Sequence, residues 1–158
     1  MLSLMYVMDG SIKTMNSTWN GPPGQMVRAL GKCFHPNTRI KLRNGIIKQI
    51  QTIDLGDILE DGSIVESIMK IDNKRDPVPL YLIKKAGVDS DDIFVTGSHL
   101  VFDEKTNQFI KVENYSKAVP TNNQIEWFSC LITSNHKIKI GNEIFWDWED
   151  HFVKILHI

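Results

Sequence analysis

Three separated groups of residues could carry chemistry. The first is Cys33, whose thiol is a potential nucleophile. The second is the segment 95–101, which holds Thr96 and His99, and the third is the segment 131–136, which ends at His136. Each group alone is a weak signal, because a single Cys is more often a small buried hydrophobic residue and a His in a β domain is more often structural. Their order along the chain makes them significant.

A thiol that attacks an amide needs help. A free thiol has a pKa of about 8.5, so only a small fraction of it is ionised at neutral pH. The amide that it attacks is stabilised by resonance. Thr96 and His99 can help, because two residues three positions apart on a turn can face one bond. We expect the hydroxyl on the carbonyl side and the imidazole to handle the proton near neutral pH. The alternative is that residues 96–98 form only a turn.

The chain changes character near Cys33. Residues 1–32 hold five of the six Met residues and the break Gly21-Pro22-Pro23-Gly24, without a sustained period of two. They predict a loosely structured leader. From Thr38 onward, short alternating runs rich in Ile and Val end at turn residues, which predicts an all-β domain.

Several runs are predicted to be strands. The clearest pair is 38–42 with 46–48, joined by the hairpin signal Asn44-Gly45. Further strands are expected at 64–71, 80–84, 93–95, 109–112, 137–140 and 143–146, the last two joined by Gly141-Asn142. The tail 147–158 could form a short helix or a final strand.

Composition excludes several classes of function. The 18 Lys and Arg residues against 19 Asp and Glu give a net charge of −1, so nucleic acid is not an expected partner. The sequence holds neither a long apolar run nor a signal-peptide pattern, so no membrane association is expected. The two cysteines, Cys33 and Cys130, fit neither a disulfide framework nor a structural zinc site. We expect no cofactor, no metal, and a monomer in a reducing, intracellular compartment.

Five motifs in order resemble the Hint (hedgehog/intein) superfamily over about residues 33–147. They are Cys33-Phe34, Thr38-x-Ile40-x-Leu42, Asn44-Gly45, Leu55-Gly56-Asp57 and Val95-Thr96-x-x-His99-Leu100-Val101. The Leu131-Ile132-Thr133-x-x-His136 form of the block at 131–136, with Phe-Trp-Asp-Trp after it, is most similar to Hint modules encoded by large DNA viruses. A virus-infected host cell is therefore the expected setting.

The resemblance implies a compact, pseudo-twofold β fold whose first residue performs an N-to-S acyl shift. In this chain, Cys33 would attack the peptide bond that joins it to Lys32, so residues 1–32 are the substrate and residues 33–158 the Hint domain. Assistance by Thr96 and His99 would contribute about 10²- to 10⁴-fold.

The end of the module departs from the intein pattern. Inteins end in a His-Asn pair followed by a second nucleophile, whereas this chain has Trp146, Asp147 and Trp148 at those positions. A carboxylate does not cyclise as a side-chain amide can, and an indole is no nucleophile. We therefore expect the thioester to be resolved by water or an external nucleophile, without splicing.

Three further residues have two interpretations each. Asp72 resembles in position the hedgehog aspartate that activates an alcohol, or it is a surface turn residue. His136 could steer the acyl oxygen, or it is a structural histidine. Cys130 could lie on a strand beside Cys33, as a buried spectator thiol or as a redox partner or secondary acceptor. His35, His151 and His157 have no expected role.

The function indicated by the sequence is therefore single-turnover cysteine autoproteolysis. One rival is a degenerate Hint fold that acts as a structural or binding module without cleavage. A cysteine hydrolase that acts in trans is a third interpretation, but Cys33 follows directly on Gly31-Lys32 at a domain edge rather than in an evident cleft.

Overall fold

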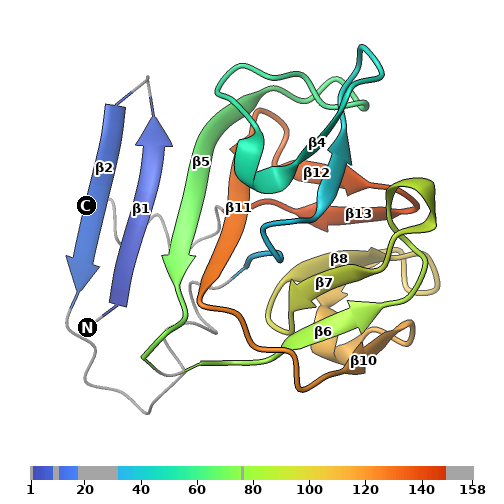
Figure 1. Ribbon diagram of the computed structural model, residues 1–158. Helices are drawn as coiled ribbons and strands as arrows, with labels where there is room; N and C mark the ends of the chain where they lie inside the picture. Colours follow the sequence, from blue (N-terminus) through green and yellow to red (C-terminus); the bar gives the residue numbers. More distant parts are fainter. Residues whose placement is uncertain (1, 9–10, 18–31, 76, 149–158) are drawn as a thin grey trace.

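The computed structural model describes residues 2–8, 11–17, 32–75 and 77–148, which form strands joined by turns (Figure 1). The strands are β1 (Leu2–Met8), β2 (Ser11–Ser17), β3 (Arg39–Lys41), β4 (Ile47–Gln49), β5 (Val65–Asp72), β6 (Leu80–Ile83), β7 (Ile93–Thr96), β8 (Leu100–Asp103), β9 (Gln108–Lys111), β10 (Ala118–Pro120), β11 (Trp127–Thr133), β12 (Lys137–Ile140) and β13 (Glu143–Trp146). Three short 3₁₀ segments join them: η1 (Ile50–Thr52), η2 (Val88–Ser90) and η3 (Val112–Asn114). The predicted all-β class is confirmed.

The longest strands form one sheet in the order β11-β5-β1-β2 (Figure 1). All its neighbours are antiparallel. In β5 the side chains alternate, with Val65, Met69 and Ile71 buried and Glu66 and Lys70 exposed. This period of two is what an amphipathic strand needs to cover a core on one face.

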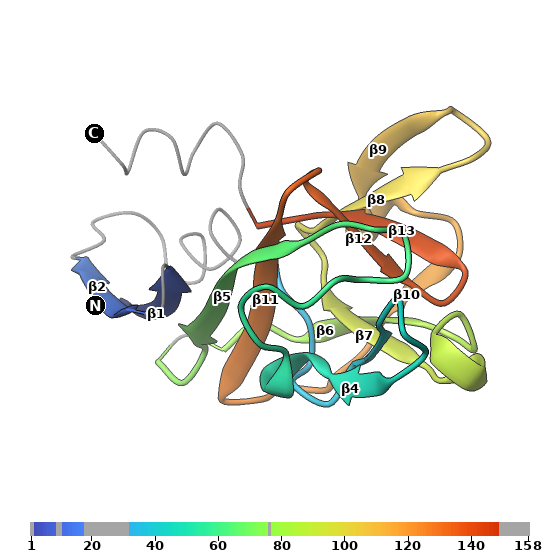
Figure 2. The same ribbon diagram turned by 90° about the horizontal axis from the view of Figure 1, so that it is seen from above.

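Shorter strands form the rest of the fold. Their orders are β10-β6-β7, β12-β13-β8-β9 and the hairpin β3-β4. Seen from above, β12 and β13 lie on the opposite side of the molecule from β6 and β7, with β11 running beside both groups (Figure 2). The core between them includes the fully buried rings of Phe34, Phe128 and Phe145. No helix in the described part of the chain is long and apolar enough to cross a membrane.

Turn chemistry explains why the hairpins close where they do. Gly45, in the predicted β3-β4 turn, has a φ of 88°. Gly141, between β12 and β13, has a φ of 55°, and a Cβ there would lie 2.3 Å from the Ala86 carbonyl oxygen. Only glycine combines that backbone angle with such a close approach. Each predicted strand is confirmed to within about two residues, within the boundary uncertainty that sequence patterns carry.

The sequence patterns missed β8, β10 and β11 as strands. The miss matters most for β11, which lies beside β5 in the main sheet. Six of its seven residues are buried, because side chains on both of its faces are covered. A strand covered on both faces loses the alternation by which a half-exposed strand is recognised.

The expectation of a loosely structured leader is wrong for residues 2–8 and 11–17. These residues form the antiparallel pair β1-β2, and Leu4–Met8 also pair with Ser67–Ile71 of β5. The dipeptide Asp9-Gly10, which lies between the two strands in the sequence, is a hairpin signal that the prediction of a leader did not use. The expectation for the tail 147–158 falls mostly on residues 149–158, which lie outside the described residues. The boundary between residues 32 and 33 stays a prediction.

Candidate active site

Cys33 lies where two sheets meet. The next residue, Phe34, bridges Val95 of β7 on one side and Ser129 of β11 on the other. The Phe34 N–H donates to the Ser129 carbonyl at 2.7 Å, and the Ser129 N–H donates back to the Phe34 carbonyl at 2.9 Å. These bonds fix the backbone at Cys33, whose side chain is fully buried.

Thr96 holds the backbone of Cys33 at two points. The Cys33 N–H donates to Thr96 Oγ1 at 3.1 Å, and the Thr96 N–H donates to the Cys33 carbonyl at 2.9 Å. The hydroxyl oxygen therefore lies at the nitrogen of the Lys32-Cys33 peptide bond. The expectation that it would lie on the carbonyl side of this bond is wrong.

His99 is held in a buried aromatic setting just after β7. Its backbone N–H donates to the Thr96 carbonyl at 3.2 Å, which confirms the predicted turn. Its ring centroid lies 4.6 Å from that of Phe34 and 5.4 Å from that of Phe145. These contacts leave the imidazole without exposed surface.

The tautomer of His99 follows from one hydrogen bond. Its Nε2 atom lies 2.6 Å from the carbonyl oxygen of Trp146. A carbonyl can only accept, so Nε2 carries the proton and Nδ1 presents a lone pair. This Nδ1 atom is buried and has no hydrogen-bond partner within the described part of the chain.

Burial also determines the charge of His99. The pKa of this imidazole is lowered to about 3, chiefly by desolvation and to a smaller extent by the nearby Lys32 charge, while the hydrogen bond to Trp146 opposes the shift. His99 is therefore neutral at pH 7. The expectation of an imidazole that titrates near neutral pH is wrong, because the aromatic enclosure disfavours its charged form.

The thiol of Cys33 is also kept in its neutral form. Burial raises the pKa of the Cys33 thiol, and a hydrogen bond to the side chain of Cys130 and the charge of that neighbour raise it further. Cys130 lies on β11 and is fully buried, so its predicted place on a strand beside Cys33 is confirmed. Attack by Cys33 therefore requires removal of the thiol proton.

The predicted terminal position lies next to these residues. Asp147 is fully buried, and its Oδ2 atom accepts from the Thr133 N–H at 2.9 Å and lies 3.1 Å from His136 Nδ1. The Asp147 N–H donates to the His136 carbonyl at 2.8 Å. The His136 ring stacks on that of Trp146, at 5.5 Å between centroids. His136 therefore contacts the end of the module, while His99 contacts the Trp146 carbonyl.

Asp72 is not part of this group. It pairs with Trp127, at the other end of β11 from Thr133, whereas Cys130 pairs with Met69. The Asp72 carboxylate accepts from the Lys74 N–H at 2.7 Å, which is the hydrogen bond of a turn aspartate. Of its two interpretations, this geometry supports the turn.

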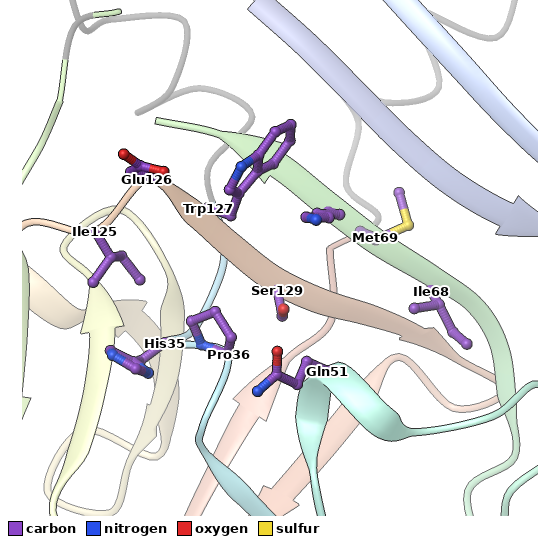
Figure 3. Close-up of a pocket in the computed structure, with 10 residues that line it drawn as sticks. His35, Pro36, Gln51, Ile68, Met69, Ile125, Glu126, Trp127 and Ser129 are labelled. Atoms are coloured by element: carbon purple, nitrogen blue, oxygen red, sulfur yellow. The ribbon is translucent and has the colours of Figure 1, made fainter. Parts of the chain in front are cut away.

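A groove of about 510 Å³ lies on the outer face of β5 and β11 (Figure 3). His35, Pro36, Trp127 and Ser129 are among the residues that line it, and Cys33, Thr96 and His99 are not. An enzyme acting in trans needs its nucleophile to face a substrate cleft. The fully buried Cys33 thiol does not fit that interpretation. His151 and His157 lie outside the described residues.

Sequence reasoning missed the groups that determine the tautomer and the charge of His99. The Trp146 carbonyl fixes the tautomer of His99, and Phe34 and Phe145 exclude water from it. Because every residue has a backbone carbonyl, no residue type in the sequence indicates this contact. The two phenylalanines follow the ordinary pattern of core residues, so only the fold brings them to His99.

Comparison with known proteins supports the fold. The sequence matches no protein-family model and no curated protein. Among solved structures, the crystal structure of gp41-1 intein is similar, with a TM-score of 0.55 and 14% identity, covering 73% of this chain and 98% of that chain. A variant of gp41-1 intein with three substitutions matches over the same shares, with a TM-score of 0.50 and 14% identity. The chain therefore has the Hint fold, in the form found in inteins.

Proposed function

We propose that this chain is a self-cleaving domain in which Cys33 converts the Lys32-Cys33 peptide bond into a thioester. The observation that carries this proposal is the hydrogen bond between the Cys33 N–H and Thr96 Oγ1, at 3.1 Å. It joins the nitrogen that must leave to a hydroxyl that can exchange a proton with it. The intein fold supports the same function.

The first step is attack by Cys33 Sγ on the carbonyl carbon of Lys32. The thiol proton must be removed, because burial keeps the pKa of the thiol above its usual value. His99 Nδ1 is suited to accept this proton, since its lone pair is buried and the other ring nitrogen already donates to Trp146. A neutral imidazole is the form that such a base requires.

The second step breaks the bond between the Lys32 carbonyl carbon and the Cys33 nitrogen. This nitrogen must gain one proton to leave as an amine, and the thiol has lost one, so the shift is balanced without outside acid. Thr96 Oγ1 donates its proton as the nitrogen becomes tetrahedral and gains a lone pair, and the His99 imidazolium then reprotonates the Thr96 oxygen. The product is a thioester between Lys32 and Cys33.

Water or a small external nucleophile then resolves the thioester, without splicing. Splicing would need a side-chain amide to cyclise at the end of the module, and Asp147 has a carboxylate there. Two hydrogen bonds to Oδ2 hold this carboxylate on β11 and His136. Trp148, the next residue, offers no nucleophilic atom.

A second candidate is a structural or binding module that keeps the fold without cleaving. The raised pKa of the Cys33 thiol favours it, because a thiol that stays protonated is a poor nucleophile. The two candidates differ in covalent chemistry, so a mass measurement separates them.

The decisive experiment is intact mass spectrometry of the purified chain with and without a small thiol or hydroxylamine. We expect cleavage between Lys32 and Cys33 that both reagents accelerate, with a hydroxamate on Lys32 in hydroxylamine. Cys33→Ala should stay at full length, with an unchanged circular dichroism spectrum. A wild-type chain that stays intact in both reagents would instead support the non-cleaving module.

A further inference from the structure

Strand β5 has a partner on each of its two edges (Figure 1). One partner, β11, follows Cys33 in the chain, whereas the other, β1, lies in the leader, residues 1–32. Residues Leu4–Met8 of β1 pair with Ser67–Ile71 of β5. The leader hairpin therefore extends the sheet of the domain from which the proposed cleavage would separate it.

Hydrogen-bond directions in β11 determine which edge each β5 residue faces. The Ser129 N–H and carbonyl are both bonded to Phe34, so the next residue, Cys130, directs its own backbone groups the other way, to β5. Cys130 pairs with Met69. The N–H and carbonyl of Met69 are therefore directed to β11.

The residues on either side of Met69 direct their backbone groups to the opposite edge of β5. They are Ile68 and Lys70, and their partners on β1 are Val7 and Met5. Each of these two pairs is then a hydrogen-bonded pair, in which each residue donates its N–H to the carbonyl of the other. Without β1, the backbone groups of Ile68 and Lys70 would lie unpaired along an edge of the sheet.

Such an edge is a template for another strand. The unpaired N–H and carbonyl groups of an edge strand bind extended peptides, and main-chain hydrogen bonds supply the affinity. Strand β5 is eight residues long, whereas short edge strands are one means by which proteins avoid such pairing. The bond between Lys32 and Cys33 lies outside β1 and β2, so cleaving it removes none of the hydrogen bonds of the ladder.

We propose that the edge of β5 is a binding site for the leader as an extended peptide, and that the leader stays bound there as β1 and β2 after the chain is cut. Cutting turns an intramolecular contact into one that can dissociate, so retention depends on the ladder itself. A retained leader keeps β5 from pairing with other chains. The binding site does not rest on the proposed function, whereas the two-chain cleavage product does.

Hydrogen exchange tests the pairing without any cleavage. Full-length Cys33→Ala is used, and NMR spectroscopy follows the backbone amides of β5. We expect the Ile68 and Lys70 amides to be protected by more than about 10²-fold relative to unpaired amides, because β1 accepts from both. Unprotected Ile68 and Lys70 amides would overturn the proposal.

Val7→Pro and Val7→Thr, each made in the Cys33→Ala chain, are a matched pair of variants. Proline has no N–H to donate to the Ile68 carbonyl, whereas threonine keeps both the N–H and a branched side chain. Protection of the Ile68 and Lys70 amides should fall in the proline variant and persist in the threonine variant, while the Met69 amide stays protected in both. Equal protection of Ile68 and Lys70 in the two variants would contradict pairing with β1 and overturn the proposal.

Retention is tested with a cut that does not use Cys33. The recognition sequence of a specific protease is inserted after Gly24 in the Cys33→Ala chain, and the cut protein is passed through a size-exclusion column in native buffer. We expect both fragments to elute together at the mass of the uncut chain, and to separate when Val7→Pro is added. A leader fragment that elutes alone without that substitution would overturn retention.

The same column applied to the wild-type chain after hydroxylamine treatment tests the natural product. Residues 1–32 and 33–158 should elute together and separate only in denaturant. A wild-type chain that never cleaves would contradict the proposed function alone, because the protease-cut chain still reports on the binding site. Separate elution of the two wild-type products would overturn retention.

Discussion

The Nε2 atom of His99 lies 2.6 Å from the carbonyl oxygen of Trp146, so β13 holds the ring that packs against Phe34, the residue after Cys33. This hydrogen bond joins the turn after β7 to the last residue of β13. It fixes the proton on Nε2 and leaves the Nδ1 lone pair for chemistry. In the proposed mechanism, β13 therefore prepares His99 for the step at Cys33.

His99→Ala should slow thioester formation by about 10²- to 10⁴-fold, because it removes the proposed base for the thiol proton. His136→Ala should have a much smaller effect, since the His136 ring contacts Asp147 and Trp146. Rates are measured as the fraction cleaved by mass spectrometry over time in hydroxylamine. Equal losses in the two variants would force a reassignment of the base.

The pH dependence of cleavage should lack an imidazole step. The pKa of His99 is lowered to about 3, so its basic form is present throughout the neutral range. The Cys33 thiol stays protonated there, because its pKa is raised. We expect a nearly constant rate from about pH 5 to about pH 8.5, and a rise only above the ordinary thiol value, where Cys33 begins to ionise. A midpoint near the ordinary imidazole value would contradict the buried, neutral state of His99.

Acid should destabilise the fold through His99. The unfolded chain binds a proton on this imidazole below its ordinary value of 6.5, whereas the folded chain does so only below about 3. Between these values the unfolded state holds more protons, so the free energy of unfolding falls as pH falls, by up to about 1.4 kcal/mol per pH unit.

His99→Phe is the matched variant for that measurement. It keeps an aromatic ring between Phe34 and Phe145 and removes the titrating group. Its free energy of unfolding, from urea titrations at several pH values, should fall less steeply in acid than that of the wild type. Parallel pH dependences would show that His99 is not the source of the acid instability.

Much of the site could be predicted from local sequence, because Thr96 ends β7 and the turn that follows it places His99. The roles of these two residues could not be predicted in the same way. Thr96 reaches the nitrogen side of the bond through pairing of β7 with the segment at Cys33. The low pKa of His99 comes from rings at positions 34 and 145, far apart in the sequence. Period-two patterns likewise found the half-exposed β5 and missed the covered β11.

Thr96→Val should slow thioester formation by about 10²-fold, at the lower end of what one acid or base group contributes. Valine keeps the shape and removes Oγ1, which leaves the buried Cys33 N–H without its acceptor, at a cost of about 1 to 3 kcal/mol in stability. Thr96→Ser restores the hydroxyl and should recover most of the rate. A serine variant as slow as the valine variant would indicate a packing role for Thr96.

The module should cleave without splicing. Ligation would need an amide at position 147 to cyclise and a Cys, Ser or Thr at 148 to accept the leader, and the chain has Asp147 and Trp148. Hydrogen bonds also hold the Asp147 carboxylate on Thr133 and His136, and the Trp148 N–H donates to the Leu131 carbonyl at 3.0 Å. Mass spectrometry should therefore find two products, residues 1–32 and residues 33–158. A species that joins residue 32 to residue 148, with 33–147 released, would contradict this prediction and make Asp147 a working terminal residue.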